Sequence, residues 1–209
     1  MIQAKDIVLF QGDSITDCGR NYQAAAPNDG LGQGYAMMAA AELLAKRPAD
    51  GLRFLNRGIS GNRIVDLYAR IKADCINLAP NVLSVLIGVN DTWHEFGGNN
   101  GVAVPKYERV YRAFLEEVRE ALPAVRFVLC EPFVLRCGCV NPEFAADVDR
   151  RREVVRRLAG EFGAPVVPFQ EVFDKASKTA PPDYWGSDGV HPSAAGHRTM
   201  ADAWLKAVS

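Results

Sequence analysis

The chain lacks both a long apolar run and an excess of charge of one sign. None of its hydrophobic stretches approaches the roughly 18 apolar residues that a membrane-spanning helix needs. Its 24 basic and 25 acidic residues leave a formal charge of -1, so it has no basic excess of the kind that nucleic-acid-binding domains carry. The basic run Arg150–Arg152 lies in an amphipathic segment, which favours a solvated helix face. We therefore expect neither a membrane nor a nucleic acid as a partner.

Cysteine and histidine are both scarce. The five cysteines are an odd number and are not spaced like the disulfide framework of a small secreted protein, so we expect reduced thiols. Cys137 and Cys139 flank one glycine, but neither a second cysteine pair nor a histidine lies at zinc-ligand spacing. The pattern indicates a loop with two thiols and no metal site.

The first residues also lack the features of a secretory leader. Met1–Asp6 leads directly into a short apolar run, without a basic region, a long apolar region or a small-residue cleavage site. On this basis we expect a cytoplasmic protein, provided that no leader has been removed.

Five short apolar runs, each ending in a turn signal, alternate with helical patterns. The runs are residues 7–10, 52–55, 82–87, 127–130 and 165–167, and the helical patterns are residues 35–46, 64–76, 106–122, 142–162 and 193–208. Because the runs do not alternate in polarity, they are typical of strands buried on both faces of a parallel sheet. The order predicts one domain over residues 1–209, a three-layer α/β/α sandwich with a five-stranded parallel sheet. Ligands of such a sheet bind beyond the carboxyl ends of its strands, so the turns at Gly12, Gly58 and Gly88 should share one crevice.

The first of these turns places a serine directly after a buried strand. Gly12-Asp13-Ser14 can hold the Ser14 hydroxyl at the sheet edge, which suits a nucleophile. The same residues are also compatible with a serine that only caps the following turn.

An acid and a histidine near the other end of the chain favour the catalytic interpretation. Asp188 precedes His191 by three residues in a loop, so its carboxylate can accept from the ring Nδ1–H and leave Nε2 free to take a proton from Ser14. Of the two other histidines, His94 suits a surface or substrate-contacting position and His197 suits the packed edge of the last helix.

A tetrahedral oxyanion needs preorganised hydrogen-bond donors, and two further turns offer them. The backbone N–H of Gly58 follows the second strand, and the side-chain amide of Asn90 follows the third. The alternatives are an ordinary turn glycine and an Asx turn that shapes only its own loop.

Together these segments resemble a known family. In order along the chain they are Gly12-Asp13-Ser14, Gly58, Gly88-x-Asn90-Asp91 and Asp188-x-x-His191. They are similar to the four sequence blocks of the SGNH (GDSL-like) hydrolases, whose name lists Ser, Gly, Asn and His. The resemblance implies a flavodoxin-like fold with strand order 2-1-3-4-5, and an oxyanion hole formed by Ser14, Gly58 and Asn90. It also implies that the enzyme uses neither a metal nor an organic cofactor.

Longer strings narrow the resemblance to a subgroup. The first block has Ile15 where the family name has leucine, and residues 12–20, 58–62 and 190–197 are similar to bacterial carbohydrate O-acetylesterases such as acetylxylan esterases. The chain also lacks the Gly-x-Ser-x-Gly elbow of the α/β-hydrolases. We therefore expect a serine esterase that removes acetyl groups from small-molecule or oligosaccharide esters.

Aromatic and imidazole side chains near the strand ends are candidates for contacting a sugar. They are Trp93, His94, Phe133, Tyr184 and Trp185. Packing of the long loops explains each aromatic equally well. Two other functions stay open: a lysophospholipase or acyl-thioesterase, and a non-catalytic sugar- or nucleotide-binding module. The sequence leaves the oligomeric state open.

Overall fold

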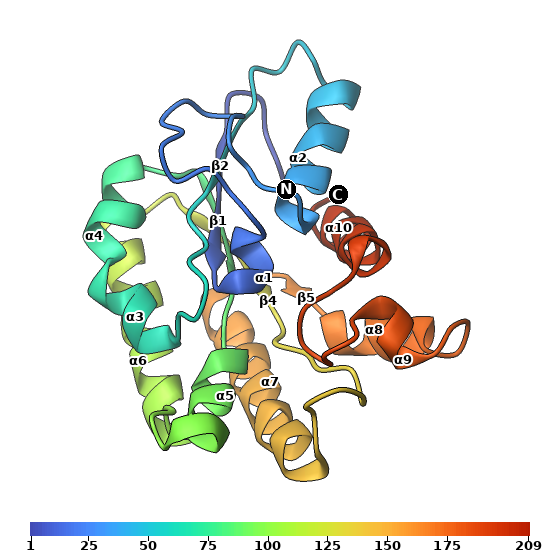
Figure 1. Ribbon diagram of the computed structural model, residues 1–209. Coiled ribbons are helices and arrows are strands. Elements are labelled where there is room, and N and C mark those ends of the chain that lie inside the picture. Colours follow the sequence, from blue (N-terminus) through green and yellow to red (C-terminus); the bar gives the residue numbers. More distant parts are fainter.

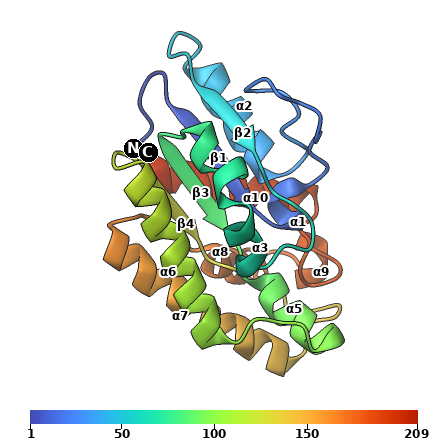
Figure 2. The same cartoon turned by 90° about the vertical axis from the view of Figure 1, so that its left-hand side faces the viewer.

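The computed structural model describes residues 1–209 as a five-stranded sheet covered by helices on both faces (Figures 1 and 2). The strands are β1 (Ile7–Gly12), β2 (Arg53–Asn56), β3 (Val82–Leu86), β4 (Arg126–Cys130) and β5 (Val166–Val167). They lie in the order β2-β1-β3-β4-β5, and all neighbours pair in parallel. The predicted α/β/α sandwich with strand order 2-1-3-4-5 is confirmed.

The helices form a layer on each side of this sheet. They are α1 (Ser14–Asp17), α2 (Tyr35–Lys46), α3 (Ile64–Ala69), α4 (Ile71–Asp74), α5 (Val89–Gly98), α6 (Val104–Ala121), α7 (Pro142–Phe162), α8 (Phe169–Ala176), α9 (Pro182–Trp185) and α10 (Ala194–Val208), with a 3₁₀ turn η1 (Ile76–Leu78). α2, α8 and α10 cover one face, and α3, α4 and α6 lie on the other (Figure 1).

The strands are mainly apolar because both faces of the sheet are buried. Successive side chains of a strand point to opposite sides of the sheet. In β1, Phe10 packs in the core beneath α2 and α10, whereas Leu9 packs in the core beneath α3 and α6. Burial on both faces also explains why the sequence shows continuous apolar runs.

The long helices match their predictions better than the short ones. α2 covers the predicted 35–46, and α7 covers the predicted 142–162 with Asn141 as N-cap, accepting the Phe144 N–H. The predicted helix 64–76 is interrupted at Arg70, whose guanidinium donates to the carbonyl of Arg57. No helix of the structure has both the length and the apolar character to cross a membrane.

Candidate active site

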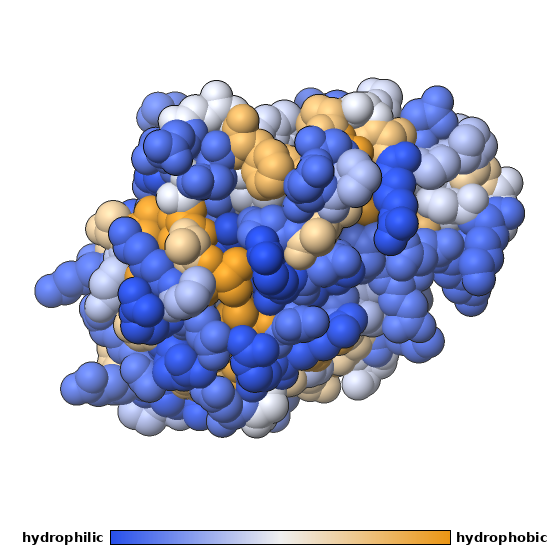
Figure 3. Space-filling model, turned by 90° about the horizontal axis from the view of Figure 1, so that it is seen from below, coloured by the Kyte–Doolittle hydropathy of each residue, from blue (hydrophilic) through white to orange (hydrophobic).

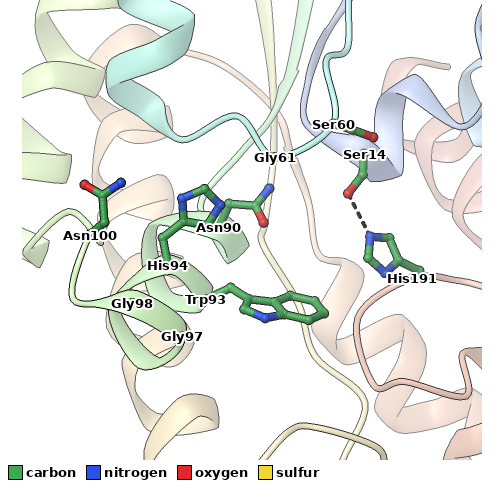
Figure 4. A pocket seen from close by; sticks show the side chains of 10 residues that line it. All are labelled: Ser14, Ser60, Gly61, Asn90, Trp93, His94, Gly97, Gly98, Asn100 and His191. Carbon is green, nitrogen blue, oxygen red and sulfur yellow. Dashed lines mark hydrogen bonds between the residues drawn. The ribbon is translucent and has the colours of Figure 1, made fainter.

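The carboxyl ends of the strands meet at a cavity of about 590 Å³. It is lined by Ser14, Ser60, Gly61, Asn90, Trp93, His94, Gly97, Gly98, Asn100 and His191 (Figure 4). Six of these residues have polar side chains, three are glycines and Trp93 is the one hydrophobic residue, so the cavity offers several hydrogen-bonding groups to a ligand. The face of the molecule seen from below is likewise mostly hydrophilic, with smaller hydrophobic areas between (Figure 3).

Ser14 is the first residue of α1, directly beyond the end of β1. Asp13 is the N-cap of this short helix, and its carboxylate accepts the N–H of Ile15 at 3.0 Å. The Ser14 Oγ lies 2.8 Å from the Nε2 of His191 (Figure 4). The backbone N–H of Ser14 has no acceptor within the protein. A substrate oxygen placed beside the hydroxyl could therefore accept from it.

Asp188 holds the other side of the His191 ring. Its Oδ2 lies 2.6 Å from Nδ1, while its Oδ1 accepts the backbone N–H of His191 and of Val190. Partial burial raises the pKa of Asp188, but these hydrogen bonds outweigh it and leave the pKa below its usual value. A carboxylate at Nδ1 favours the tautomer with the proton on Nδ1, so Nε2 is free to accept the Ser14 proton.

The two-thiol loop, residues 135–140, packs against the segment that carries this acid. The Leu135 N–H donates to the Gly189 carbonyl at 2.8 Å, and the Cys139 N–H donates to the Asp188 carbonyl at 3.0 Å. The Cys139 thiol reaches the same carbonyl at 3.1 Å. All five cysteines are unpaired in the structure. The sequence alone indicated no function for this loop. In the structure, the loop supports the position of Asp188.

The structure corrects the assignment of Gly58 as an oxyanion donor. Its buried N–H donates to Oδ1 of Asn56 at 2.9 Å, and Gly58 does not line the cavity. Its glycine identity has a packing cause, because an added Cβ would lie 2.3 Å from the backbone nitrogen of Asp17.

Gly61, which the sequence analysis did not select, occupies the position expected of Gly58. It lines the cavity beside Ser60, and its N–H has no acceptor within the protein. It has a φ of 81° in a turn that is closed by the Asn62 N–H donating to the Ile59 carbonyl. A positive φ at the third position of a turn requires glycine, so the spacing Gly58-Ile59-Ser60-Gly61 held the signal.

Asn90 lies on the opposite side of the cavity, in the first turn of α5. One amide hydrogen of its Nδ2 donates to the carbonyl of Asn62 at 3.2 Å, which leaves the second hydrogen for a ligand. The neighbouring Asp91 is fully buried, and burial raises its pKa to about 7; burial raises the pKa of Asp13 to a similar value. The structure thus brings Ser14, Asn90, Asp188 and His191 together as the sequence predicted.

The predicted substrate contacts divide into two groups. Trp93 and His94 line the cavity, and the Trp93 ring centroid is 5.7 Å from that of His191. Phe133 does not, because it is fully buried and stacks on Phe173 at 4.5 Å. Tyr184 and Trp185 lie on α9 outside the cavity, and the Trp185 indole donates to the carbonyl of Ala180. The assignment of Phe133 is therefore corrected, whereas those of Tyr184 and Trp185 stay predictions.

Two other predictions concern groups around the site. His197 is buried, accepts the Tyr35 N–H at Nδ1 and lies 3.3 Å from the Cys18 thiol, so it has the packed position expected for it. The expectation of a solvated face for Arg150–Arg152 holds only in part. Arg151 is 2% exposed and its guanidinium donates to the Thr92 hydroxyl and the Asp147 carboxylate.

Comparisons with known proteins agree with this geometry. The family model described as GDSL-like lipase/acylhydrolase matches residues 10–199. An acetylxylan esterase from Geobacillus stearothermophilus is 35% identical over 206 residues, which cover 96% of this chain and 93% of that protein.

Solved structures of related proteins share the fold of this chain over almost its whole length. A candidate GDSL-like lipase from Parabacteroides merdae is 43% identical, with a TM-score of 0.95 over 99% of this chain and 97% of that chain. The acetylxylan esterase Axe2 of G. stearothermophilus has a TM-score of 0.91 at 34% identity, over 100% of this chain and 96% of that one. Axe2 structures with a serine, an aspartate or a histidine replaced by alanine are described as catalytic mutants, and the aspartate and histidine lie three positions apart.

Proposed function

The chain belongs to the GDSL-like lipase/acylhydrolase family, and we propose that it is a serine esterase that removes O-acetyl groups from carbohydrates. The observation that carries the proposal is the continuous hydrogen-bonded series from Ser14 through His191 to Asp188. The reaction class follows from the family, whereas the acetylated sugar and the role of each residue are proposed.

The proposed reaction has two chemical steps. In the first, the Ser14 Oγ attacks the acetyl carbonyl carbon while the Nε2 of His191 takes the hydroxyl proton. His191 then gives this proton to the departing sugar oxygen, which leaves an acetyl group on Ser14. In the second step His191 takes a proton from water, the resulting hydroxide attacks the acetyl-enzyme, and acetate leaves as Ser14 recovers its proton. Asp188 stabilises the imidazolium that forms in both steps.

The negative charge that develops on the carbonyl oxygen needs donors fixed in advance. We assign this role to the backbone N–H of Ser14, the backbone N–H of Gly61 and the free amide hydrogen of Asn90. All three residues line the same cavity, and none of these hydrogens has an acceptor within the protein. Three free donors at one cavity would stabilise a negatively charged oxygen more than a neutral carbonyl oxygen.

Two observations support an acetylated sugar as substrate. Six of the ten residues that line the cavity have polar side chains, and Trp93 is the one large apolar side chain on which a sugar ring could stack. The relative that is 35% identical is described as an acetylxylan esterase. A long acyl chain would need an apolar trough, and this cavity does not provide one.

The experiment is acetate release from peracetylated xylose, measured beside p-nitrophenyl esters from acetyl to dodecanoyl, for the wild type and Ser14→Ala. We expect activity on acetyl esters only, lowered by at least about 10³-fold in Ser14→Ala. A preference for long acyl chains would move the assignment to a lysophospholipase or thioesterase. Activity that survives the substitution would overturn the mechanism, and a wild type without any esterase activity would favour a sugar-binding module.

A further inference from the structure

The loop that carries Gly61 is held by a carboxylate that the proposed reaction does not use. We call residues 57–63, between β2 and α3, the oxyanion loop. Its tip is the turn from Ile59 to Asn62, with Ser60 and Gly61 at the centre. The loop also positions a second donor, because the Asn62 carbonyl accepts one amide hydrogen of Asn90. Its placement relative to Ser14 therefore affects two of the three proposed oxyanion donors.

Asp17 connects this loop to the helix of the nucleophile. It lies three residues after Ser14 in α1 and is 5% exposed. Its Oδ2 accepts the backbone N–H of Ser60 at 3.1 Å and also the hydroxyl of Tyr22, while its Oδ1 accepts the N–H of Arg20 at 3.2 Å. Three donors thus converge on one buried carboxylate, and one of them comes from the residue directly before Gly61.

We propose, on the basis of the function proposed above, that Asp17 is a positioning residue that sets the oxyanion loop at its catalytic distance from Ser14. Ser14 and Asp17 share one turn of helix, so a hydrogen bond from Ser60 to Asp17 fixes the turn relative to the nucleophile. A hydrogen bond to a carboxylate is stronger than one between two neutral groups, which makes this contact a suitable tie at 3.1 Å. Asp17 does not itself touch the reacting atoms.

The other end of the oxyanion loop is tied in the same way. Both carboxylate oxygens of Asp91 lie 3.2 Å from the backbone nitrogen of Ile64, the first residue of α3. Asp91 directly follows Asn90, as Asp17 follows Ser14 by one turn. α1 and α5, which carry Ser14 and Asn90, therefore each also supply a buried carboxylate that holds the oxyanion loop. Of the two ties, the one at Asp17 is nearer to Gly61.

Asp17→Asn tests the proposal with little change in volume. An asparagine has one acceptor oxygen, and its amide nitrogen would face either the Ser60 N–H or the Arg20 N–H, donor against donor. Loss of one oxyanion donor costs roughly 10²- to 10³-fold in kcat, and displacement of a donor should cost less. We expect kcat for p-nitrophenyl acetate to fall roughly 10- to 100-fold while KM changes by less than about threefold.

Tyr22→Phe is the matched control, because it removes another hydrogen bond to the same Oδ2 and leaves the Ser60 contact in place. We expect its kcat to stay within about twofold of the wild type. The rate of Ser14 labelling by a serine-directed phosphonate should follow kcat in both variants, because negative charge also develops on the phosphonyl oxygen when Ser14 attacks the phosphorus. This readout needs no sugar, so a wild type that is labelled but releases no acetate would contradict the proposed substrate without affecting the role of Asp17.

A measurement on the wild type covers the case in which Asp17→Asn does not fold. In an amide NMR spectrum, the Ser60 proton should be shifted downfield and protected from exchange, as expected for an N–H bound to a carboxylate. The Gly61 amide proton should exchange quickly and become protected once Ser14 carries the phosphonyl group. An unprotected Ser60 amide, or an Asp17→Asn enzyme with wild-type kcat and labelling rate, would overturn the proposal.

Discussion

At the scale of single residues, Asn90 provides the most direct test of the proposed oxyanion hole. One of its amide hydrogens is used by the Asn62 carbonyl, so only the second can stabilise charge on a substrate. Asn90→Ala removes that donor and should lower kcat for acetyl esters by roughly 10²- to 10³-fold with little change in KM. Steady-state kinetics with p-nitrophenyl acetate would measure both constants.

Asn100→Ala is the control for this prediction. Asn100 lines the same cavity, but its side chain accepts from Arg63 and has no place in the proposed chemistry. We expect its kcat to remain within a few fold of the wild type. Equal losses in the two variants would indicate a general effect on the cavity and would remove the evidence for Asn90 as a donor.

The sequence identifies side chains that act through local motifs more readily than backbone donors. Asp188 and His191 are three positions apart, so one short loop can bring the carboxylate and the ring together. The direction of a backbone N–H depends instead on the turn that contains it. Gly58 and Gly61 both follow the same strand. Only the hydrogen bond from Gly58 to Asn56 shows that the N–H of Gly58 already has an acceptor within the protein. Phe133 was misplaced for a related reason, since its burial depends on α8, which the sequence analysis did not predict.

At the scale of elements, the two-thiol loop and the loop of the catalytic acid pack so closely at Gly138 that a side chain there would meet the backbone of Asp188. Gly138 has a φ of 59°, and an added Cβ would lie 2.3 Å from both the carbonyl carbon and the carbonyl oxygen of Asp188. Backbone atoms at that distance must move. Gly138→Ala should therefore displace Asp188 from His191 and lower kcat by more than about tenfold, although residue 138 is no part of the proposed chemistry.

The control for Gly138→Ala is a glycine that has room for a methyl group. Gly160 lies in α7 with nothing within 4 Å of an added Cβ. Gly160→Ala should keep wild-type activity and raise the melting temperature slightly, because alanine is the better helix former. Measurement of kcat and melting temperature for both variants separates the two effects. Wild-type kcat in Gly138→Ala would show that this contact does not position Asp188.

The sequence analysis missed the short helices, among them α1 and α5 next to the cavity. α2 and α7 have clear apolar periodicity and caps, and their bounds agree with the prediction. α5 ends in Gly97 and Gly98, and α1 has only one turn, so neither has a pattern that distinguishes it from a loop. Hydrogen bonds from other elements also hold them, as when Asp17 in α1 accepts from Ser60. Local periodicity cannot report contacts of that kind.

At the scale of the whole molecule, the last helix joins the first catalytic turn from the other end of the chain. His197 in α10 accepts the Tyr35 N–H at the start of α2 through Nδ1, which leaves Nε2–H to face the Cys18 thiol just after α1. This arrangement requires a neutral ring. Burial, with a smaller contribution from His191, lowers the pKa of His197 from 6.5 to about 4.

The depressed pKa makes His197 a source of acid sensitivity. Between pH 6.5 and 4 the unfolded chain binds a proton at this position and the folded chain does not, so stability falls as pH falls through this range. The full effect is about 3 kcal/mol at most. Asp13 and Asp91, whose pKa values are raised to about 7, have the opposite effect on stability. The folded chain keeps their protons more tightly than the unfolded chain does, so the stability that they contribute is lost as pH rises from about 4 to 7.

A comparison with His197→Asn separates the histidine from these carboxylates. Asparagine places an acceptor near the position of Nδ1 and does not titrate, while Asp13 and Asp91 are unchanged and cancel in the difference. Urea unfolding at a series of pH values should show the wild type more stable than the variant above pH 6.5, because the variant loses the contact with Cys18. That advantage should shrink as the pH falls to 4. A stability difference that is independent of pH would contradict the assignment of a neutral, buried His197 as the acid-sensitive link between α10 and the nucleophile's turn.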